Sequence, residues 1–187
     1  DFSLGRIGEE WLLNLPTIGR ANTAANLGSR SGLRINEWLA NPPSGEDDWF
    51  EVFNSGTLPV DLGGLLLSDD PAEPGKSPIP ARSYIGVGTD RFIKFLADDN
   101  VQNGPNHAAF RLSSATVHVV LSQPDGMTID AVSFANQVAG MSEGRLPDGG
   151  APVVRFSDTI SPGHPNYLLL TDVIINEILT HTDPPLE

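Results

Sequence analysis

The fold class is decided by Val117-His118-Val119-Val120-Leu121, the turn Pro124-Asp125-Gly126, and Thr128-Ile129-Asp130-Ala131-Val132-Ser133-Phe134. The two outer runs are rich in β-branched and aromatic residues, which are typical of strands. Proline presets φ at the first central position of a turn, and glycine accepts a positive φ at its end. The stretch therefore predicts a β-hairpin.

Short apolar runs of the same kind recur along the chain, and long helical periodicity is hard to find. The 19 glycines and 16 prolines separate these runs, as in domains with many strands and turns. Alternation along Leu33-Arg34-Ile35-Asn36-Glu37-Trp38-Leu39 predicts a strand with Leu33, Ile35 and Glu37 on one face. Further strands are predicted at residues 49–53, 60–62, 65–68, 83–87, 92–96 and 153–156. The sequence thus favours an all-β fold.

Two motifs are repeated at nearly the same offset. Ser3-Leu4-Gly5-Arg6-Ile7 returns as Ser142-Glu143-Gly144-Arg145-Leu146, which begins 139 residues later. Arg34-Ile35-Asn36-Glu37-Trp38-Leu39 returns as Ile174-Ile175-Asn176-Glu177-Ile178-Leu179, which begins 140 residues later. Solenoid repeats are shorter, about 20–50 residues, so this period indicates repeated whole domains.

The repeats divide the chain into one complete unit and two partial ones. Residues 33–166 form the complete domain, residues 1–22 the end of a preceding unit, and residues 167–187 a linker and the first strand of a following unit. Residues 23–32 are small and polar, as expected of a linker. We expect Trp11-Leu12-Leu13-Asn14-Leu15 to be the last strand of the preceding unit.

The composition argues against several classes of partner. Lysine and arginine number 11 against 24 aspartate and glutamate residues, so the formal net charge is −13. Nucleic acids and anionic membranes both require clustered basic charge, so neither is expected as a partner. There is no cysteine, and hence no thiol nucleophile, disulfide or cysteine-ligated zinc site. A run of about 18 apolar residues, needed for membrane insertion, is also missing from the sequence.

An ordered set of motifs across residues 33–166 resembles the lamin tail domain family. The motifs are Ile35-Asn36-Glu37 with Asn41-Pro42, Trp49-Phe50-Glu51-Val52-Phe53-Asn54, Val60-Asp61-Leu62-Gly63-Gly64, Phe110-Arg111-Leu112-Ser113, Ser142-Glu143-Gly144-Arg145-Leu146-Pro147-Asp148-Gly149 and Ser161-Pro162-Gly163-His164-Pro165-Asn166. The resemblance implies an immunoglobulin-like β-sandwich of two packed antiparallel sheets. The acidic charge and the repeats resemble the bacterial members that form tandem arrays.

The motif residues admit a catalytic and a structural interpretation. Glu37 and Glu51 would need to lie around a cleft to act as an acid/base pair. The structural alternative, which we favour, places each in solvent or against backbone groups at a strand edge. For Arg6 and Arg145 we favour bonds to backbone carbonyls over an anion or partner contact. No catalytic residue is predicted, and the structural motif comprises Asn36, Glu37, Glu51, Asn54, Asp61, Gly144 and Arg145.

The metal signals are weak. Asp69 and Asp70, in a loop after a predicted strand, are the best candidates for calcium, which takes six to eight oxygen ligands. The loop does not match the D-x-[DN]-x-[DN]-G pattern, so solvated acids are favoured and no metal or cofactor is predicted. The four histidines have no zinc-type spacing.

The expected function is that of a non-catalytic structural, adhesive or protein-interaction module. The setting would be a tandem array in a large bacterial secreted or cell-surface protein, with a protein or polysaccharide ligand. The alternatives are an accessory, targeting or substrate-binding domain of a secreted multidomain hydrolase, and a calcium-rigidified spacer. The apolar end segments would expose strand edges, so self-association through the terminal strands is also expected.

Overall fold

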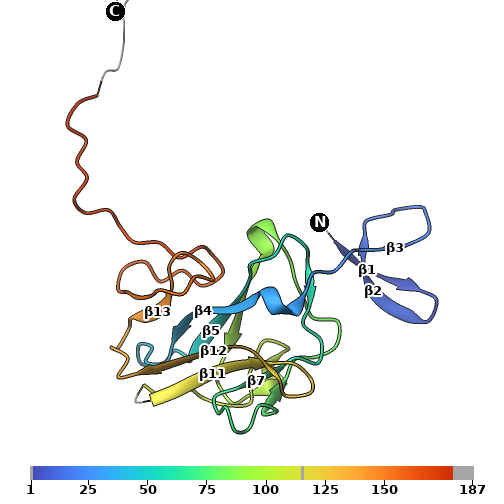
Figure 1. The fold of residues 1–187 in the computed structure, drawn as a ribbon, viewed down its shortest axis with the longest axis horizontal. Coiled ribbons are helices and arrows are strands. Elements are labelled where there is room, and N and C mark those ends of the chain that lie inside the picture. Colours follow the sequence, from blue (N-terminus) through green and yellow to red (C-terminus); the bar gives the residue numbers. More distant parts are fainter. Residues whose placement is uncertain (1, 115, 179–187) are drawn as a thin grey trace, which may run out of the picture.

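A computed structural model describes residues 2–114 and 116–178, and it is an antiparallel all-β sandwich (Figure 1). One sheet has the order β10-β5-β4-β13-β14 and the other the order β12-β11-β7-β8. The strands of the first sheet are β4 (Leu33–Leu39), β5 (Trp49–Asn54), β10 (Phe92–Leu96), β13 (Ser142–Arg145) and β14 (Val153–Phe156). Those of the second are β7 (Leu66–Ser68), β8 (Ser77–Pro78), β11 (Thr116–Ser122) and β12 (Thr128–Ala135). The prediction of an immunoglobulin-like all-β sandwich is confirmed.

Smaller elements lie around the sandwich. β6 (Val60–Asp61) pairs with β9 (Tyr84–Ile85), and β1 (Ser3–Ile7), β2 (Glu10–Leu15) and β3 (Thr23–Ala24) form a separate three-stranded sheet. Among the described residues, three single-turn 3-10 helices span Arg30–Gly32, Gly88–Asp90 and Val101–Asn103. No helix in residues 2–114 and 116–178 has the length and apolar character needed to cross a membrane.

The predicted central hairpin is formed by β11 and β12, which pair antiparallel through a turn in which Gly126 has φ 86°. Val119 and Leu121 of β11 enter the hydrophobic core, and so do Val132 and Phe134 of β12. This period of two places one face of the hairpin against the opposite sheet.

Aromatic side chains join the two sheets. Trp38 of β4 stacks on Phe134 of β12 with ring centroids 5.7 Å apart. Phe50 of β5 is fully buried, and its ring lies 5.5 Å from that of Phe95 and 6.0 Å from that of Phe110. These stacked rings fill the middle of the sandwich, where burial of apolar area stabilises the fold most.

The predicted alternation of β4 is wrong beyond Ile35. Ile35 lies opposite Val52 and Glu37 lies opposite Glu51, so Asn36 is an extra residue in a β-bulge. Leu33 and Ile35 join the core, whereas the bulge turns Glu37 to the other face of the sheet. A strict alternation pattern in the sequence does not reveal an inserted residue of this kind.

The N-terminal sheet packs beside the sandwich (Figure 1). The predicted strand at residues 11–15 lies within β2, and the guanidinium of Arg82 lies 5.9 Å from the Trp11 ring centroid. Residues 23–32 are more ordered than the predicted linker. Thr23–Ala24 pairs with β2 as β3, and Arg30 donates a 2.9 Å hydrogen bond to the carbonyl of Asp61.

The C-terminal segment runs away from the sandwich, on the side opposite the N-terminal sheet (Figure 1). Residues 173–178 are exposed and form no strand, in contrast to the strand predicted there, and Leu179 lies outside the described residues. A strand obtains its inter-chain hydrogen bonds from a neighbour, so β-branched residues alone do not create one.

Candidate functional site

Glu37 and Glu51 lie side by side in the middle of the five-stranded sheet, on the face turned away from the hydrophobic core. Both side chains are fully buried, beneath the segment that follows β14. The expectation that they lie in solvent or at a strand edge is therefore wrong, whereas the bonds to backbone groups that it included are present. The segment after β14 covers them because its amide groups use these carboxylates as hydrogen-bond acceptors.

Each carboxylate binds a different part of the covering segment. The hydroxyl of Ser142 donates a 2.5 Å hydrogen bond to Glu37, which also accepts from the amide and the hydroxyl of Ser161 at 3.3 Å each. Glu51 accepts a hydrogen bond from the amide of Gly163. The carboxylates thus provide acceptors for the amide of Ser161, which is buried, and for that of Gly163, which is half-buried.

Asn36, the bulge residue, joins the pair to the loop between β13 and β14. Its side-chain nitrogen donates to Glu51 at 3.1 Å and to Asp148 at 3.0 Å. Its side-chain oxygen accepts from the amide of Gly149 at 2.8 Å. Asp148 in turn accepts from the amide of Asn166 at 2.9 Å. We call Asn36, Glu37, Glu51, Ser142, Asp148, Ser161 and Asn166 the polar network.

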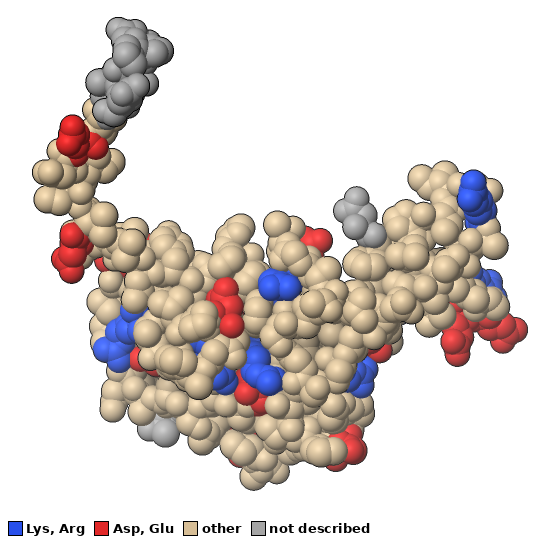
Figure 2. Space-filling view, turned by 45° about the horizontal axis from the view of Figure 1, so that its top comes forward, with Lys and Arg blue, Asp and Glu red and all other residues tan. Residues whose placement is uncertain are grey.

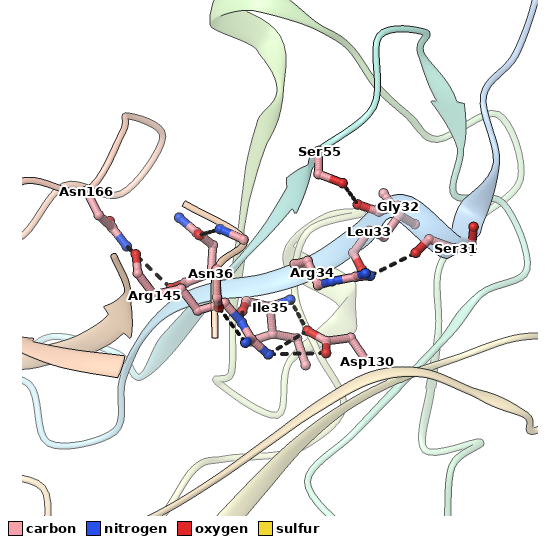
Figure 3. Close-up of polar contacts among 12 residues, drawn as sticks. Ser31, Gly32, Leu33, Arg34, Ile35, Asn36, Ser55, Asp130, Arg145 and Asn166 are labelled. Carbon is pink, nitrogen blue, oxygen red and sulfur yellow. Dashed lines mark hydrogen bonds and ion pairs between the residues drawn. The ribbon is translucent and has the colours of Figure 1, made fainter. Parts of the chain in front are cut away.

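The side chains of Arg145 and Asp130 bind the backbone of β4 where the pairing of β13 with β4 ends (Figure 3). The amide of Ile35 donates to Asp130 at 2.8 Å, and the carbonyl of Ile35 accepts from Arg145 at 2.8 Å. Arg145 also donates to the carbonyl of Gly150 and forms an ion pair with Asp130 at 3.2 Å. Side chains thus replace backbone partners beside the bulge.

Gly144 permits the close approach of β13 to β4. A Cβ atom there would lie 2.6 Å from the backbone oxygen of Asn36 and 3.1 Å from the Cα of Glu37. Since the obstacles are backbone atoms, a side chain at this position would separate the two strands.

The other motif residues, Asn54 and Asp61, stabilise loops elsewhere. Asn54 donates to the carbonyls of Leu58 and Gly86 at 2.9 and 2.8 Å. Asp61 accepts from the amide of Gly63 and forms a 3.1 Å ion pair with Arg30. Both serve local backbone geometry and lie apart from the polar network.

Sequence reasoning did not assign site roles to Asp130, Ser142, Asp148, Ser161 and Asn166. A signal for three of them was present, because Ser142 already corresponds to Ser3 in the first repeated motif. Thr17-Ile18-Gly19-Arg20-Ala21-Asn22 repeats the pattern of Ser161-Pro162-Gly163-His164-Pro165-Asn166, with matching hydroxyl, glycine and asparagine positions. The roles of Asp130 and Asp148 depend on contacts between distant segments, which this repeat does not encode.

The weak metal candidates are engaged within their own loop. Asp69 forms a 2.8 Å ion pair with Lys76, and Asp70 accepts a 2.8 Å hydrogen bond from the amide of Ala72. Across residues 2–114 and 116–178, no group of three or more histidine, aspartate or glutamate side chains could hold a metal ion.

Burial raises the pKa values of both glutamates. Burial raises the pKa of Glu51 to about 8, although hydrogen bonds from Gly163 and Asn36 oppose the shift. Burial also raises the pKa of Glu37, against the hydrogen bonds from Ser142 and Ser161. Nearby Asp148 raises both pKa values further. The value of about 8 favours the protonated form of Glu51 at neutral pH.

This protonation predicts an unusual pH dependence of stability. Between the ordinary pKa of 4.5 and the native value of about 8, folded Glu51 keeps a proton that the unfolded chain has released. Its contribution is thus complete below pH 4.5 and is lost as the pH rises through about 8. Urea unfolding should show a lower free energy of unfolding at pH 8.5 than at pH 5, by on the order of 1 kcal/mol or more.

Glu51→Gln should reduce this pH slope, because glutamine does not titrate. Glu46→Gln, at an exposed loop position, is the matched control and should leave the slope unchanged. A free energy of unfolding that stays constant or rises from pH 5 to pH 8.5 in the unaltered protein would contradict the assignment.

Two surface cavities lie near these elements. One of about 300 Å³ is lined by residues that include Phe53, Arg91, Phe92, Asp148 and His164. Arg91 lies 5.4 Å from the Phe53 ring centroid, and its buried Nε has no hydrogen-bond partner within the described part of the chain. The other, of about 450 Å³, lies where the N-terminal sheet meets the sandwich. The first has the mixed apolar and polar lining of a ligand site.

The fold and the polar network define a β-sandwich module in which the buried carboxylates of Glu37 and Glu51 accept hydrogen bonds from the domain's own backbone. The sequence profile described as Lamin Tail Domain matches residues 28–136, more than half of the chain. The chain belongs to the lamin tail domain family. Neither the curated proteins nor the solved structures contain a match. The structure extends the domain beyond the matched region, since β13 and β14 belong to the same sheet as β4.

Proposed function

We propose that this chain is a non-catalytic structural, adhesive or protein-interaction module. The observation that supports this most strongly is that hydrogen bonds from within the domain occupy the carboxylates of Glu37 and Glu51. Both carboxylates are fully buried and accept hydrogen bonds from the domain's own covering segment. An acid/base pair must reach the proton that it transfers, and these groups are occupied by internal donors.

The module would be one unit of a tandem array in a large bacterial secreted or cell-surface protein. The likeness between the β1–β2 and β13–β14 hairpins supports the array. Ser3 lies opposite Asn14 as Ser142 lies opposite Phe156, and Gly5 occupies the position of Gly144. A repeated hairpin is what the end of a preceding unit would leave beside the next domain.

The cavity beside Arg91 is the proposed place for a protein or polysaccharide ligand. Two phenylalanine rings supply apolar surface, while Arg91, Asp148 and His164 supply polar groups that could orient the ligand. The same cavity would serve the alternative role, that of an accessory domain that brings a secreted hydrolase to its substrate. Acidic and basic side chains are scattered over the face seen in Figure 2, without a broad basic patch for nucleic acid.

Turnover and binding measurements test the proposal together. The protein should show background turnover with ester, phosphodiester, peptide and glycoside substrates. A panel of soluble polysaccharides and peptides should include a binder whose nuclear magnetic resonance shifts map to the cavity and whose affinity falls on Arg91→Ala. Arg155→Ala, which removes an exposed guanidinium on β14, is the control. Saturable turnover abolished by Glu51→Gln would contradict the proposal.

A further inference from the structure

The β13–β14 hairpin shows how this fold receives an Asn-Glu strand. β4 lies along the outer edge of β13, with Glu37 opposite Gly144 and Trp38 opposite Glu143. Ser142 donates to Glu37, and Asn166 donates at 2.9 Å to the carbonyl of Arg145. Gly144, Ser142 and Asn166 together form the site on the hairpin at which β4 pairs.

The β1–β2 hairpin carries the same arrangement of residues and bonds. Asn22 donates at 2.9 Å to the carbonyl of Arg6, as Asn166 does to that of Arg145. Thr17 donates to Asn22 at 3.4 Å, as Ser161 donates to Asn166 at 3.1 Å. The turn bond from the amide of Arg20 to the carbonyl of Thr17 measures 2.9 Å, equal to the bond from His164 to Ser161.

The glycines of the two hairpins have similar surroundings. A Cβ at Gly5 would lie 2.8 Å from the side-chain nitrogen of Asn22, and one at Gly144 would lie 2.8 Å from that of Asn166. The side-chain oxygen of Asn14 beside Gly5 is buried and has no hydrogen-bond partner among the described residues. This place is therefore polar and incompletely bonded.

The outer edge of β13 is paired with β4, whereas the outer edge of β1 has no such neighbour among the described residues. β1 is the first strand of the order β1-β2-β3, and within residues 2–114 and 116–178 no strand pairs with its outer edge. Leu4 and Ile7 of this strand are 48% and 37% exposed. An edge strand with exposed apolar side chains favours the addition of another strand.

The C-terminal segment repeats the sequence of β4, the strand that pairs with the corresponding edge of β13. Ile175-Asn176-Glu177-Ile178 repeats Ile35-Asn36-Glu37-Trp38 of β4. Its apolar side chains are unpaired, with Ile174 84%, Ile175 79% and Ile178 70% exposed. The segment and the N-terminal sheet lie at opposite sides of the sandwich (Figure 1), so pairing between two copies needs no bending of the tail across the domain.

We propose that residues 173–178 of one copy add to the outer edge of β1 of another copy as an antiparallel strand. The pairing of β4 with β13 sets the register, with Glu177 opposite Gly5 and Ile178 opposite Leu4. Glu177 then accepts hydrogen bonds from Ser3 and Thr17, and Arg6 turns from the carbonyl of Gly8, to which it now donates, to that of Ile175. This inference rests on the matched hairpins and concerns the 187-residue chain; in the proposed array, a neighbouring unit would supply the same strand pairing.

Two features define the energetics and symmetry of this interface. The short turn of the β1–β2 hairpin has no counterpart of Asp148 or Gly149, so Asn176 gains fewer bonds than Asn36 and the interface depends mainly on Glu177. The contact joins two different surfaces, so it is heterologous and produces rings or open chains of copies.

Sedimentation of the 187-residue protein over a range of concentrations tests the assembly. Self-association is expected, and Glu177→Gln should weaken it about tenfold or more because a charged acceptor is lost from a covered site. Gly5→Val should also weaken it, because the added side chain would displace Asn14 and Asn22 from the edge that the new strand approaches. Asp172→Asn, which alters an exposed acid outside the paired register, should leave it unchanged.

Amide shifts identify the surface independently of assembly size. A peptide of residues 171–178, added to isotope-labelled protein, should shift the amides of residues 3–7 and 17–22, and its Glu177→Gln version should bind about tenfold or more weakly. A monomer at all concentrations, shifts confined to the sandwich, or association unaffected by both Glu177→Gln and Gly5→Val would each overturn the proposal.

Discussion

Replacing Phe50 with alanine is expected to lower the free energy of unfolding by about 3–5 kcal/mol. Phe50 is fully buried, and its ring stacks on both Phe95 and Phe110. Alanine would remove the apolar contacts of the ring and leave a cavity that β-strands held by hydrogen bonds cannot close. Equilibrium urea unfolding followed by tryptophan fluorescence measures the change.

Phe2→Ala is the matched control, because Phe2 is 38% exposed and lies outside the sandwich. We expect it to change the free energy of unfolding by about 0.5 kcal/mol or less. A loss below about 1 kcal/mol for Phe50→Ala would contradict the assignment of Phe50 to a close-packed core.

Replacing Glu37 with alanine is expected to lower the free energy of unfolding by about 3 kcal/mol, a net of opposing effects. The substitution leaves the amide of Ser161 and the hydroxyls of Ser142 and Ser161 without their acceptor. Each buried donor left unpaired costs about 1–3 kcal/mol, and the removal of a buried carboxylate offsets part of that cost. The covering segment should detach first, since it binds directly to Glu37.

Urea unfolding measures the total loss, and limited proteolysis between Phe156 and Asn166 reports detachment of the covering segment. Glu46→Ala removes a carboxylate from an exposed loop and should leave both measurements unchanged. Equal stability and equal protease resistance of Glu37→Ala and the unaltered protein would show that the carboxylate does not hold the segment.

The local elements were predictable from sequence because their signals are local. The hairpin of β11 and β12 follows from two β-branched runs and a Pro-Asp-Gly turn, and no distant contact is needed to specify it. The order of motifs gave the family and therefore the sandwich. The strand boundaries of β4, β5 and β14 also follow from short apolar runs that end at turn residues.

The burial of Glu37 and Glu51 was not predictable from these patterns. Asn36 forms the bulge without a glycine or proline to mark it, so alternation along β4 misplaced Glu37. The segment that covers both glutamates contributes hydrogen bonds over more than 100 residues of sequence separation. Periodicity describes which face of a strand a residue occupies, whereas the cover over that face is set by the tertiary fold.

The terminal segments show the same limit. Residues 11–15 form the strand predicted for them because β1 and β3 supply neighbours. Residues 173–178 are rich in β-branched side chains but have no neighbouring strand among the described residues, and they form no strand and are exposed. Strand formation requires a partner as well as a favourable sequence.

The central claim is that Glu37 and Glu51 hold the domain's own backbone and do not act on a substrate. Hydrogen exchange at the amides of Ser161 and Gly163 tests it most directly, since these amides donate to the two carboxylates. We predict that both exchange as slowly as strand amides of β5, and that Glu37→Ala accelerates exchange at Ser161. Exchange of both amides as fast as that of the exposed residues 173–178 in the unaltered protein would contradict the claim.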